Sequence, residues 1–585
     1  MAKEGNYIIE PIYQGGYSSL NPDYGGNFTG YRMSAREIGM VTDTRTANIL
    51  KDLSDNISSG IKVMEISQPD ARTFESIPRQ HLKEVNQLSK LTGVNVTLHA
   101  PIIEPSGIGD KGFGESNRVA AERQMIQAVE RAHELSPKGN IPVTFHSSAG
   151  LPGEITELGK EIDEIIVINP ETGSGNKIPI RKRKYPGEES GIKREVEEAN
   201  EKSWLSQLRN ISYYANWGAK TIQDTGYAAK IDLKENVENL TPEDRRLRSE
   251  FKSGSASINN SYGEVRDLFE TAYKYGSEEE KHRLNEFAEK IKEKAEKIKQ
   301  APDSQTGIIM KKQIIDEGLE LFNELRPQVV KPLNEFAKER TAETFANVAL
   351  HGYKEFKNNA PIISIENPPA GEAFSTGKEL KEIVELSREK FIENAKKQGM
   401  GESEARNQAE KLIGATLDVG HMNMLRRYGY KNKDLIKEAK EVAPLVKHVH
   451  LSDNFGFEHT ELPMGMGNVP IKEIMKKLGE EGFEGKKIIE AGDWWQHFSP
   501  GAGNKSGSPL KPTLEAFGSP VYAMDMGPYW NQAPGFRQDY SSGIGQIYPQ
   551  INSETWGTGF SQLPAELGGQ RPGAQGSRMS GTPME

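Results

Sequence analysis

The chain has 585 residues and contains no cysteine, which excludes disulfide frameworks, Fe–S clusters, cysteine-ligated zinc and cysteine nucleophiles. Its formal net charge is −10, so a wholly basic nucleic-acid-binding surface is absent, although a local basic groove is compatible with this balance. No run approaches the ~20 apolar residues that a membrane span requires. The first residues carry no apolar signal segment, and we therefore expect a cytoplasmic protein with no membrane partner.

The N-terminal part of the chain predicts an irregular arm followed by alternating strands and helices. Residues 1–35 are rich in Gly, Tyr and Asn without a clear period, which indicates the arm. Residues 36–150 then predict strands at Met40–Val41, Val63–Ser67, Val94–Leu98 and Pro142–Phe145, and helices at Arg45–Asn56, His81–Leu91 and Arg118–Leu135. This alternation is typical of parallel strands joined by crossover helices.

A strongly charged segment over residues 151–359 interrupts this alternation and predicts a mainly helical insertion. Ser277 and Glu280 form a capping-box pattern, and apolar residues then recur every three or four positions up to Ile298. Two more amphipathic helices are expected at Ile308–Leu325 and Leu333–Leu350. The role of the insertion is left open, with protein contacts or self-association as the interpretations.

Alternation resumes over residues 360–497. The pattern predicts strands at Ile362–Ile365, Ala415–Leu417, His448–Leu451 and Lys487–Ile489, and helices at Gly377–Gln398, Asp434–Val442 and Ile471–Leu478. Segments 36–150 and 360–497 together supply eight β/α units, so we predict an α/β fold, a (β/α)8 TIM barrel with the insertion between strands four and five. Residues 498–585 are rich in Gly, Pro, Ser and Gln and are expected to form an irregular tail.

Six of the predicted strands end at a side chain that can bind a metal. These side chains are His99, His146, Glu366, Asp418 with His421 three residues later, His450 and Glu490. Any one of them alone could be a hydrogen-bonded structural histidine or a loop-capping carboxylate. Because the carboxyl ends of all strands of a TIM barrel meet at one mouth, the whole set instead predicts a metal site of the kind that suits Zn²⁺, Mn²⁺ or Fe²⁺.

Four motifs resemble those of the xylose isomerase-like TIM barrel superfamily: Leu98-His-Ala-Pro101, Leu417-Asp-Val-Gly-His421, His450-Leu-Ser-Asp-Asn454 and Gly465-x-Gly467. The resemblance covers about residues 36–150 and 360–497. It does not extend to the arm, the insertion or the tail. The superfamily includes sugar isomerases and epimerases, and also the endonuclease IV family of apurinic/apyrimidinic (AP) endonucleases.

These two branches differ in the number of metal ligands. The isomerase and epimerase branch implies one divalent metal, held by Glu366, Asp418, His450 and Glu490, with Glu366 and Glu490 as the catalytic candidates. The ligand pattern is closest to the endonuclease IV branch, which implies three metals, usually zinc. That resemblance implies a first metal on His99, His146 and Glu366, a second on Glu366, Asp418, His450 and Glu490, and a third on His421, His459 and Glu461.

Two departures from the endonuclease IV pattern concern loops at the mouth. In His459-Thr-Glu461 the imidazole and the carboxylate have exchanged places relative to the Asp-x-His of that family. The loop at Ile102–Gly107 lacks the Tyr and the Asn-Leu pair with which the family's loop enters DNA. The metal site therefore resembles the nuclease branch, while the loops that read the substrate do not.

The resemblance implies a metal-dependent phosphodiester hydrolase, acting in DNA repair on abasic or damaged DNA through a metal-bound hydroxide. The expected cofactor is Zn²⁺, up to three ions, with Mn²⁺ or Mg²⁺ as alternatives. The first alternative is a single-metal isomerase or epimerase acting on a small sugar or sugar phosphate. The second is a metal-binding barrel without catalysis whose helical insertion binds a partner.

Overall fold

The computed structural model describes residues 38–491 and residue 513, with gaps at 45–46, 58–61, 156, 159, 161, 183–190, 226–240, 301–304 and 466. The predicted arm at 1–35 lies outside the described residues, as does the predicted tail at 498–585 apart from residue 513. The chain divides into two compact units, one formed by Met1–Glu161 with Ala337–Glu585 and the other by Ile162–Phe336. Within the described part of the chain, no helix combines the length and the apolar character needed to cross a membrane.

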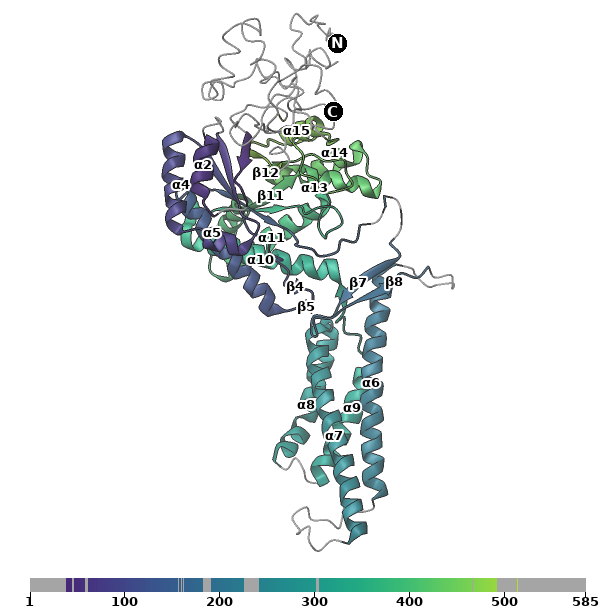
Figure 1. The fold of residues 1–585 in the computed structure, drawn as a ribbon. Helices are drawn as coiled ribbons and strands as arrows, with labels where there is room; N and C mark the ends of the chain where they lie inside the picture. Colours follow the sequence, from purple (N-terminus) through teal and green to yellow (C-terminus); the bar gives the residue numbers. More distant parts are fainter. Residues whose placement is uncertain are drawn as a thin grey trace, which may run out of the picture. The chain divides into compact units, whose positions relative to one another are not determined.

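Eight parallel strands close into a barrel in the first unit (Figure 1). Around the barrel they are β1 (Ile38–Val41), β13 (Lys486–Ile489), β12 (Val446–Leu451), β11 (Ile413–Asp418), β10 (Ile362–Glu366), β6 (Pro142–His146), β3 (Asn95–His99) and β2 (Val63–Ser67). Barrel strands that follow one another along the chain are neighbours in the barrel, including β6 and β10, between which the chain passes through the second unit. The predicted TIM barrel is confirmed, with all eight strands at the predicted places.

Helices fill the connections between the barrel strands. They are α2 (Ile49–Ile57), α3 (Ala71–Ser76), α4 (Arg79–Thr92), α5 (Glu115–Leu135), α10 (Leu333–Phe356), α11 (Gly377–Lys397), α12 (Glu402–Leu412), α13 (Val419–Asn423), α14 (Asn432–Val442) and α15 (Ile471–Glu480). Helix α11 begins at a capping box between Thr376 and Glu379, and α4 ends at Gly93 in the left-handed conformation that glycine adopts without strain. A short hairpin, β4 (Ile108–Gly109) and β5 (Gly112–Phe113), precedes α5.

The register of the strands gathers polar side chains at one end of the barrel. Glu366 lies opposite His146 across the β10–β6 pair, and Asp418 lies opposite His450 across the β11–β12 pair. The buried residues that precede them in β10 and β11 are mostly apolar, as expected for strands covered on both faces. The carboxyl ends of β10, β11 and β12 therefore carry Glu366, Asp418 and His450, which the closed barrel brings to one end.

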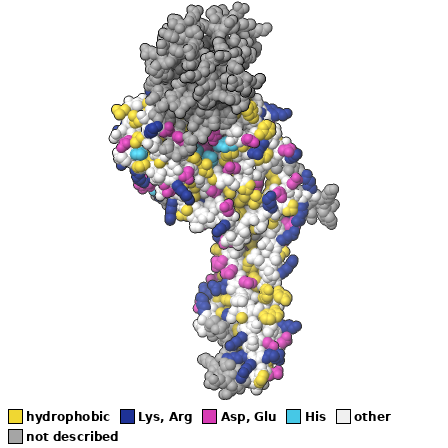
Figure 2. All heavy atoms as spheres, in the orientation of Figure 1, with side chains coloured by type: hydrophobic (Ala, Val, Ile, Leu, Met, Phe, Trp, Pro, Cys, Tyr) yellow, Lys and Arg dark blue, Asp and Glu magenta, His cyan; other side chains and the backbone are white. Residues whose placement is uncertain are grey.

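The second unit contains four long helices that lie side by side (Figure 1): α6 (Ile192–Asp224), α7 (Pro242–Tyr275), α8 (Glu278–Gln300) and α9 (Gln305–Phe322). Their core includes Trp204, Phe322 and Leu284. Basic and acidic side chains are interspersed over the face of this unit that Figure 2 shows, as the many ion pairs along its helices require. The helical prediction is confirmed in general, but it misses an antiparallel sheet formed by β7 (Glu164–Ile168), β8 (Gly175–Pro179) and β9 (Lys331–Pro332).

Candidate metal centre

A first group of candidate ligands meets where β3, β6 and β10 end. The carboxylate oxygen Oε2 of Glu366 lies 3.2 Å from Nε2 of His99 and 3.3 Å from Nε2 of His146. The ligand atoms of these three residues all lie within 4.8 Å of one another, so one cation could contact all of them. The group supplies two imidazoles and one carboxylate, a donor set that suits zinc.

A second group shares Glu366 with the first. The other oxygen of Glu366, Oε1, lies 2.8 Å from Nδ1 of His450, and Oε2 of Glu490 lies 2.9 Å from the same nitrogen. Together with Asp418 these residues form a set of four whose ligand atoms also lie within 4.8 Å of one another. The two oxygens of the Glu366 carboxylate thus face two different sets of nitrogen donors.

Neighbouring groups fix the orientation of the candidate ligands. Nδ1 of His99 lies 2.8 Å from the carbonyl oxygen of Ala100, to which it donates as an N–H, so Nε2, which faces Glu366, is the nitrogen that could bind a metal after losing its proton. Asp418 ends β11 and caps α13, since its Oδ1 accepts from the backbone N–H of His421 at 2.7 Å and from the hydroxyl of Ser452 at 3.3 Å. Such contacts hold a ligand in one geometry before a metal arrives.

In the third predicted group His421 contacts His459 and His459 contacts Glu461, but among the described residues these three are not one of the sets whose ligand atoms all lie within 4.8 Å of one another. Nδ1 of His421 lies 2.8 Å from the carbonyl oxygen of Asn367, which directs Nε2 towards Nε2 of His459, also at 2.8 Å. Nε2 of His459 lies 3.7 Å from Oε1 of Glu461, so the exchanged order in this loop still presents one imidazole and one carboxylate. The side chains of His459 and Glu461 are 38% and 32% exposed, so this group forms the solvent-facing part of the centre.

Burial and mutual contact shift the charges of the centre strongly. Burial alone would raise the pKa of Glu366, but the imidazoles of His450 and His146 hold it well below the usual range. Burial and the nearby charge of Glu490 raise the pKa of Asp418 well above its usual value. Burial and the same Glu490 carboxylate raise the pKa of Glu461 to about 8. The carboxylates therefore repel one another in a largely buried site, where solvent screens their charges weakly.

Protons on histidine offset this negative charge in the metal-free protein. Burial opposes protonation of His99, but its contact with Glu366 outweighs burial and raises the pKa of His99 to about 9. The carboxylates of Glu366 and Glu490 likewise raise the pKa of His450 well above its usual value against the effect of burial. Cations in these positions would replace the protons and balance the carboxylates, so the residues present fit divalent metals.

Metal binding is expected to release about two or more protons per chain at pH 7, because His99 and His450 must lose theirs to become ligands. The pKa of His99 is about 9, so the apparent metal affinity should fall as pH falls below 9. Titration calorimetry in buffers of different ionisation enthalpy measures the release. An observed enthalpy that does not depend on the buffer would contradict this assignment.

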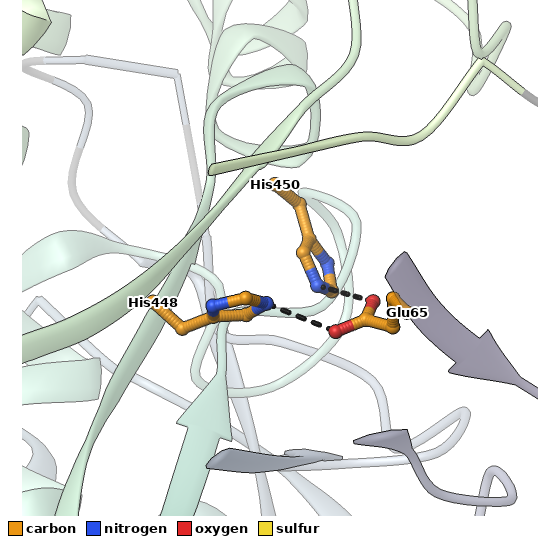
Figure 3. A group of neighbouring side chains, drawn as sticks. All are labelled: Glu65, His448 and His450. Atoms are coloured by element: carbon orange, nitrogen blue, oxygen red, sulfur yellow. Dashed lines mark hydrogen bonds and ion pairs between the residues drawn. The ribbon is translucent and has the colours of Figure 1, made fainter. Parts of the chain in front are cut away.

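Two buried residues of the centre are absent from the sequence prediction, Glu65 and His448 (Figure 3). Glu65 lies within β2 and His448 within β12, and both side chains are fully buried. Oε2 of Glu65 lies 2.9 Å from Nε2 of His448, and Oε1 lies 3.0 Å from Nε2 of His450. The sequence offers two signals for these residues: Glu65 is a charged residue inside an apolar strand, and His448 stands two positions before His450.

The nine predicted ligands thus lie in contact with one another around the carboxyl ends of the strands and the loop after β12. Glu65 and His448 contact the same set from inside the barrel. Such a set could bind divalent cations, polarise an oxygen of a bound substrate and exchange protons with it. The four-residue group could hold one metal by itself. Because Glu366 also belongs to the group with His99 and His146, its carboxylate would allow two metal ions to bind side by side.

Comparisons with known proteins agree with this architecture. Residues 363–505 match the family model described as "Xylose isomerase-like TIM barrel". An uncharacterized protein of Methanocaldococcus jannaschii is 31% identical over 80 residues, which are 14% of this chain and 26% of that protein. The chain therefore spans about a quarter of the length of this relative.

Two solved structures are similar at a low level. A D-tagatose 3-epimerase-like protein has a TM-score of 0.32 and 14% identity, over 78% of this chain and 90% of that chain. D-psicose 3-epimerase, solved in the presence of D-fructose, has a TM-score of 0.31 and 11% identity, over 86% of this chain and 98% of that chain. Neither likeness carries a conclusion about function. The described strands thus close into a TIM barrel, and residues 363–505 are similar to the xylose isomerase-like TIM barrel family.

Proposed function

We propose that this chain is a divalent-metal-dependent enzyme that hydrolyses phosphodiesters, with abasic or otherwise damaged DNA as its substrate. The position of Glu366 carries the proposal. Its Oε2 faces His99 at 3.2 Å, and its Oε1 faces His450 at 2.8 Å. A carboxylate placed in this way can bridge two cations, and centres with two metals are typical of enzymes that cleave phosphate esters.

Each residue of the centre has a distinct part in this proposal. Divalent cations would polarise the phosphoryl group and make the attacking water easier to deprotonate. Glu366 would hold two cations at a fixed separation, and the carbonyl of Ala100 would keep His99 in the tautomer that binds metal. Two divalent cations against Glu366, Asp418 and Glu490 leave a net charge of about +1, which favours an anionic substrate over a neutral one.

The cofactor assignment follows from the donor atoms. The first group contributes two imidazoles and one carboxylate, and this mixture favours Zn²⁺, with Mn²⁺ as the next candidate. His421, His459 and Glu461 would hold a third ion in the more exposed part of the centre.

A second candidate function is isomerisation or epimerisation of a sugar at a single metal. Glu366, Asp418, His450 and Glu490 form a complete ligand set without the other histidines. The description of the matched family names a sugar isomerase, which favours this alternative at the level of the family. Glu366 and Glu490 would then be the candidates for proton transfer next to a carbonyl. His99 and His146 have no ligand role in this alternative.

A duplex containing one abasic site distinguishes the two functions. Protein loaded with Zn²⁺ or Mn²⁺ is expected to cut the damaged strand and to leave an undamaged duplex of the same sequence intact. D-fructose, the sugar named with one of the similar structures, serves as the competing substrate. Epimerisation of D-fructose or another ketohexose without any strand cleavage would contradict the phosphodiesterase proposal and support the single-metal sugar enzyme.

A further inference from the structure

A layer of buried polar side chains lies inside the barrel next to the candidate ligands, on the side of the amino-terminal ends of the strands. Residues two positions apart in a strand point to the same side, so the residue two positions before a ligand also faces the interior. The layer contains Glu65, Thr97, Thr144, Ser364, Thr416 and His448. Hydrogen bonds join its members: the hydroxyl of Thr416 donates to that of Ser364 at 2.7 Å and lies 3.0 Å from that of Thr144.

Glu65 is the only carboxylate among these six residues, and all its contacts are with the layer or with the ligand set. Its Oε2 accepts from the hydroxyl of Thr97 at 2.8 Å and lies 2.9 Å from Nε2 of His448 (Figure 3). Its Oε1 lies 3.0 Å from Nε2 of His450, at ion-pair distance but outside good hydrogen-bond alignment. Burying a carboxylate raises the free energy of the folded protein unless such partners compensate the charge, so the position of Glu65 next to His450 indicates a specific role.

The ring of His450 lies between Glu65 and the candidate ligands. Its Nδ1 faces Glu366 and Glu490 at 2.8 and 2.9 Å, while its Nε2 faces Glu65. A histidine can bind a metal through Nδ1 as a neutral ligand only when Nε2 carries the proton. An acceptor next to Nε2 stabilises that tautomer and fixes the plane of the ring.

We propose that Glu65 is a positioning residue that holds His450 with Nδ1 towards the metal centre, and that His448 and Thr97 hold Glu65 in place. The inference rests on the proposed metal centre and adds a residue that acts on it through His450. Glu65 would not contact substrate or metal.

The same three residues are also close enough to hold a cation themselves. The positioning role is favoured because such a cation would need Nε2 of His450 while Nδ1 serves the main centre. One ring would then have to lose both N–H protons. In addition, Oε2 of Glu65 already accepts from Thr97 and contacts His448. An additional metal is therefore an outcome that the experiment must separate from positioning.

The test is Glu65→Gln in the full chain, with Co²⁺ as the probe. An amide has one acceptor oxygen in place of two, so it cannot accept both from Nε2 of His450 and from Thr97. We expect metal affinity to fall by about 10- to 100-fold at unchanged stoichiometry, with a changed visible absorption spectrum of bound Co²⁺. The matched control is Glu379→Gln, a half-buried carboxylate at the start of α11, whose capping box tolerates glutamine. This control should bind Co²⁺ as the wild type does.

Three results would overturn the inference in distinguishable ways. Wild-type affinity and spectrum in Glu65→Gln would make Glu65 a structural residue only. Loss of one metal equivalent, with the remaining affinity unchanged, would make it a ligand. A wild-type protein that binds no divalent metal would remove the proposed function and this inference with it. If Glu65→Gln does not fold, a crystal structure of the metal-loaded wild type decides: coordination of His450 through Nδ1 is expected, and coordination through Nε2 overturns the inference.

Discussion

Replacement of Glu366 by glutamine is expected to abolish strand cleavage and to lower metal affinity by more than ~100-fold, since even indirect partners of a metal ligand contribute 10- to 100-fold. Glu366 is the one residue shared by the first two ligand groups, and it is fully buried. An amide has one acceptor oxygen and no charge, so it can neither bridge two cations nor balance them. The measurements are cleavage of the abasic duplex and metal content per chain.

Glu379→Gln is the control for this change as well, because it neutralises a half-buried carboxylate of α11 outside the candidate centre. It should keep metal content and cleavage at the wild-type level. Retention of both properties by Glu366→Gln would mean that Glu366 bridges nothing, and the two-metal proposal would fail.

Metal loading is expected to stabilise the barrel by about 2.7 kcal/mol for a site held at 100 times its dissociation constant. Such a gain corresponds to roughly 3–5 °C in melting temperature for a unit of this size, since the entropy of unfolding is about 2.1 cal/mol/K per residue. The physical reason is the burial of Glu366, Asp418 and Glu490 around His450, where their mutual repulsion must be offset. Differential scanning calorimetry with Mn²⁺ and with a chelator measures the shift.

The same experiment on Glu366→Gln provides the internal comparison, because a variant without a competent centre should gain little from metal. Equal melting temperatures of wild-type protein with metal and with chelator would show that the buried carboxylates are balanced without cations. The protons on His99 and His450 would then be sufficient for the stability of the site.

The barrel could be predicted from the sequence because its signals are local. Short apolar strands alternate with amphipathic helices, and runs such as Ile362–Glu366 end at an ionisable residue. Closure of the barrel then brings strand ends together, so the neighbourhood of His99, Glu366 and Glu490 follows once the fold is known. In the loop after β12, His459 contacts His421, while Glu461 contacts His459, so the third ion of the motif resemblance stays a prediction.

The features that were not predicted depend on pairing between distant segments. The strand Glu164–Ile168 is a short β-branched run, but its partners include Lys331–Pro332, far along the chain. Glu65 belongs to no recognisable motif, and its contacts with His448 and His450 are known only once the fold brings β2 and β12 together in the barrel interior. Side-chain alternation identifies inward positions but does not say which of them touch.

The number of metal ions per chain tests the central claim most directly. Protein expressed with Zn²⁺ and Mn²⁺ supplied, freed of loosely bound metal and measured by inductively coupled plasma mass spectrometry, should hold at least two equivalents, and three if His421, His459 and Glu461 are occupied. One equivalent, lost on mutation of Glu490 but kept in a His99→Gln and His146→Gln double variant, would contradict the shared-carboxylate centre and support the single-metal sugar enzyme.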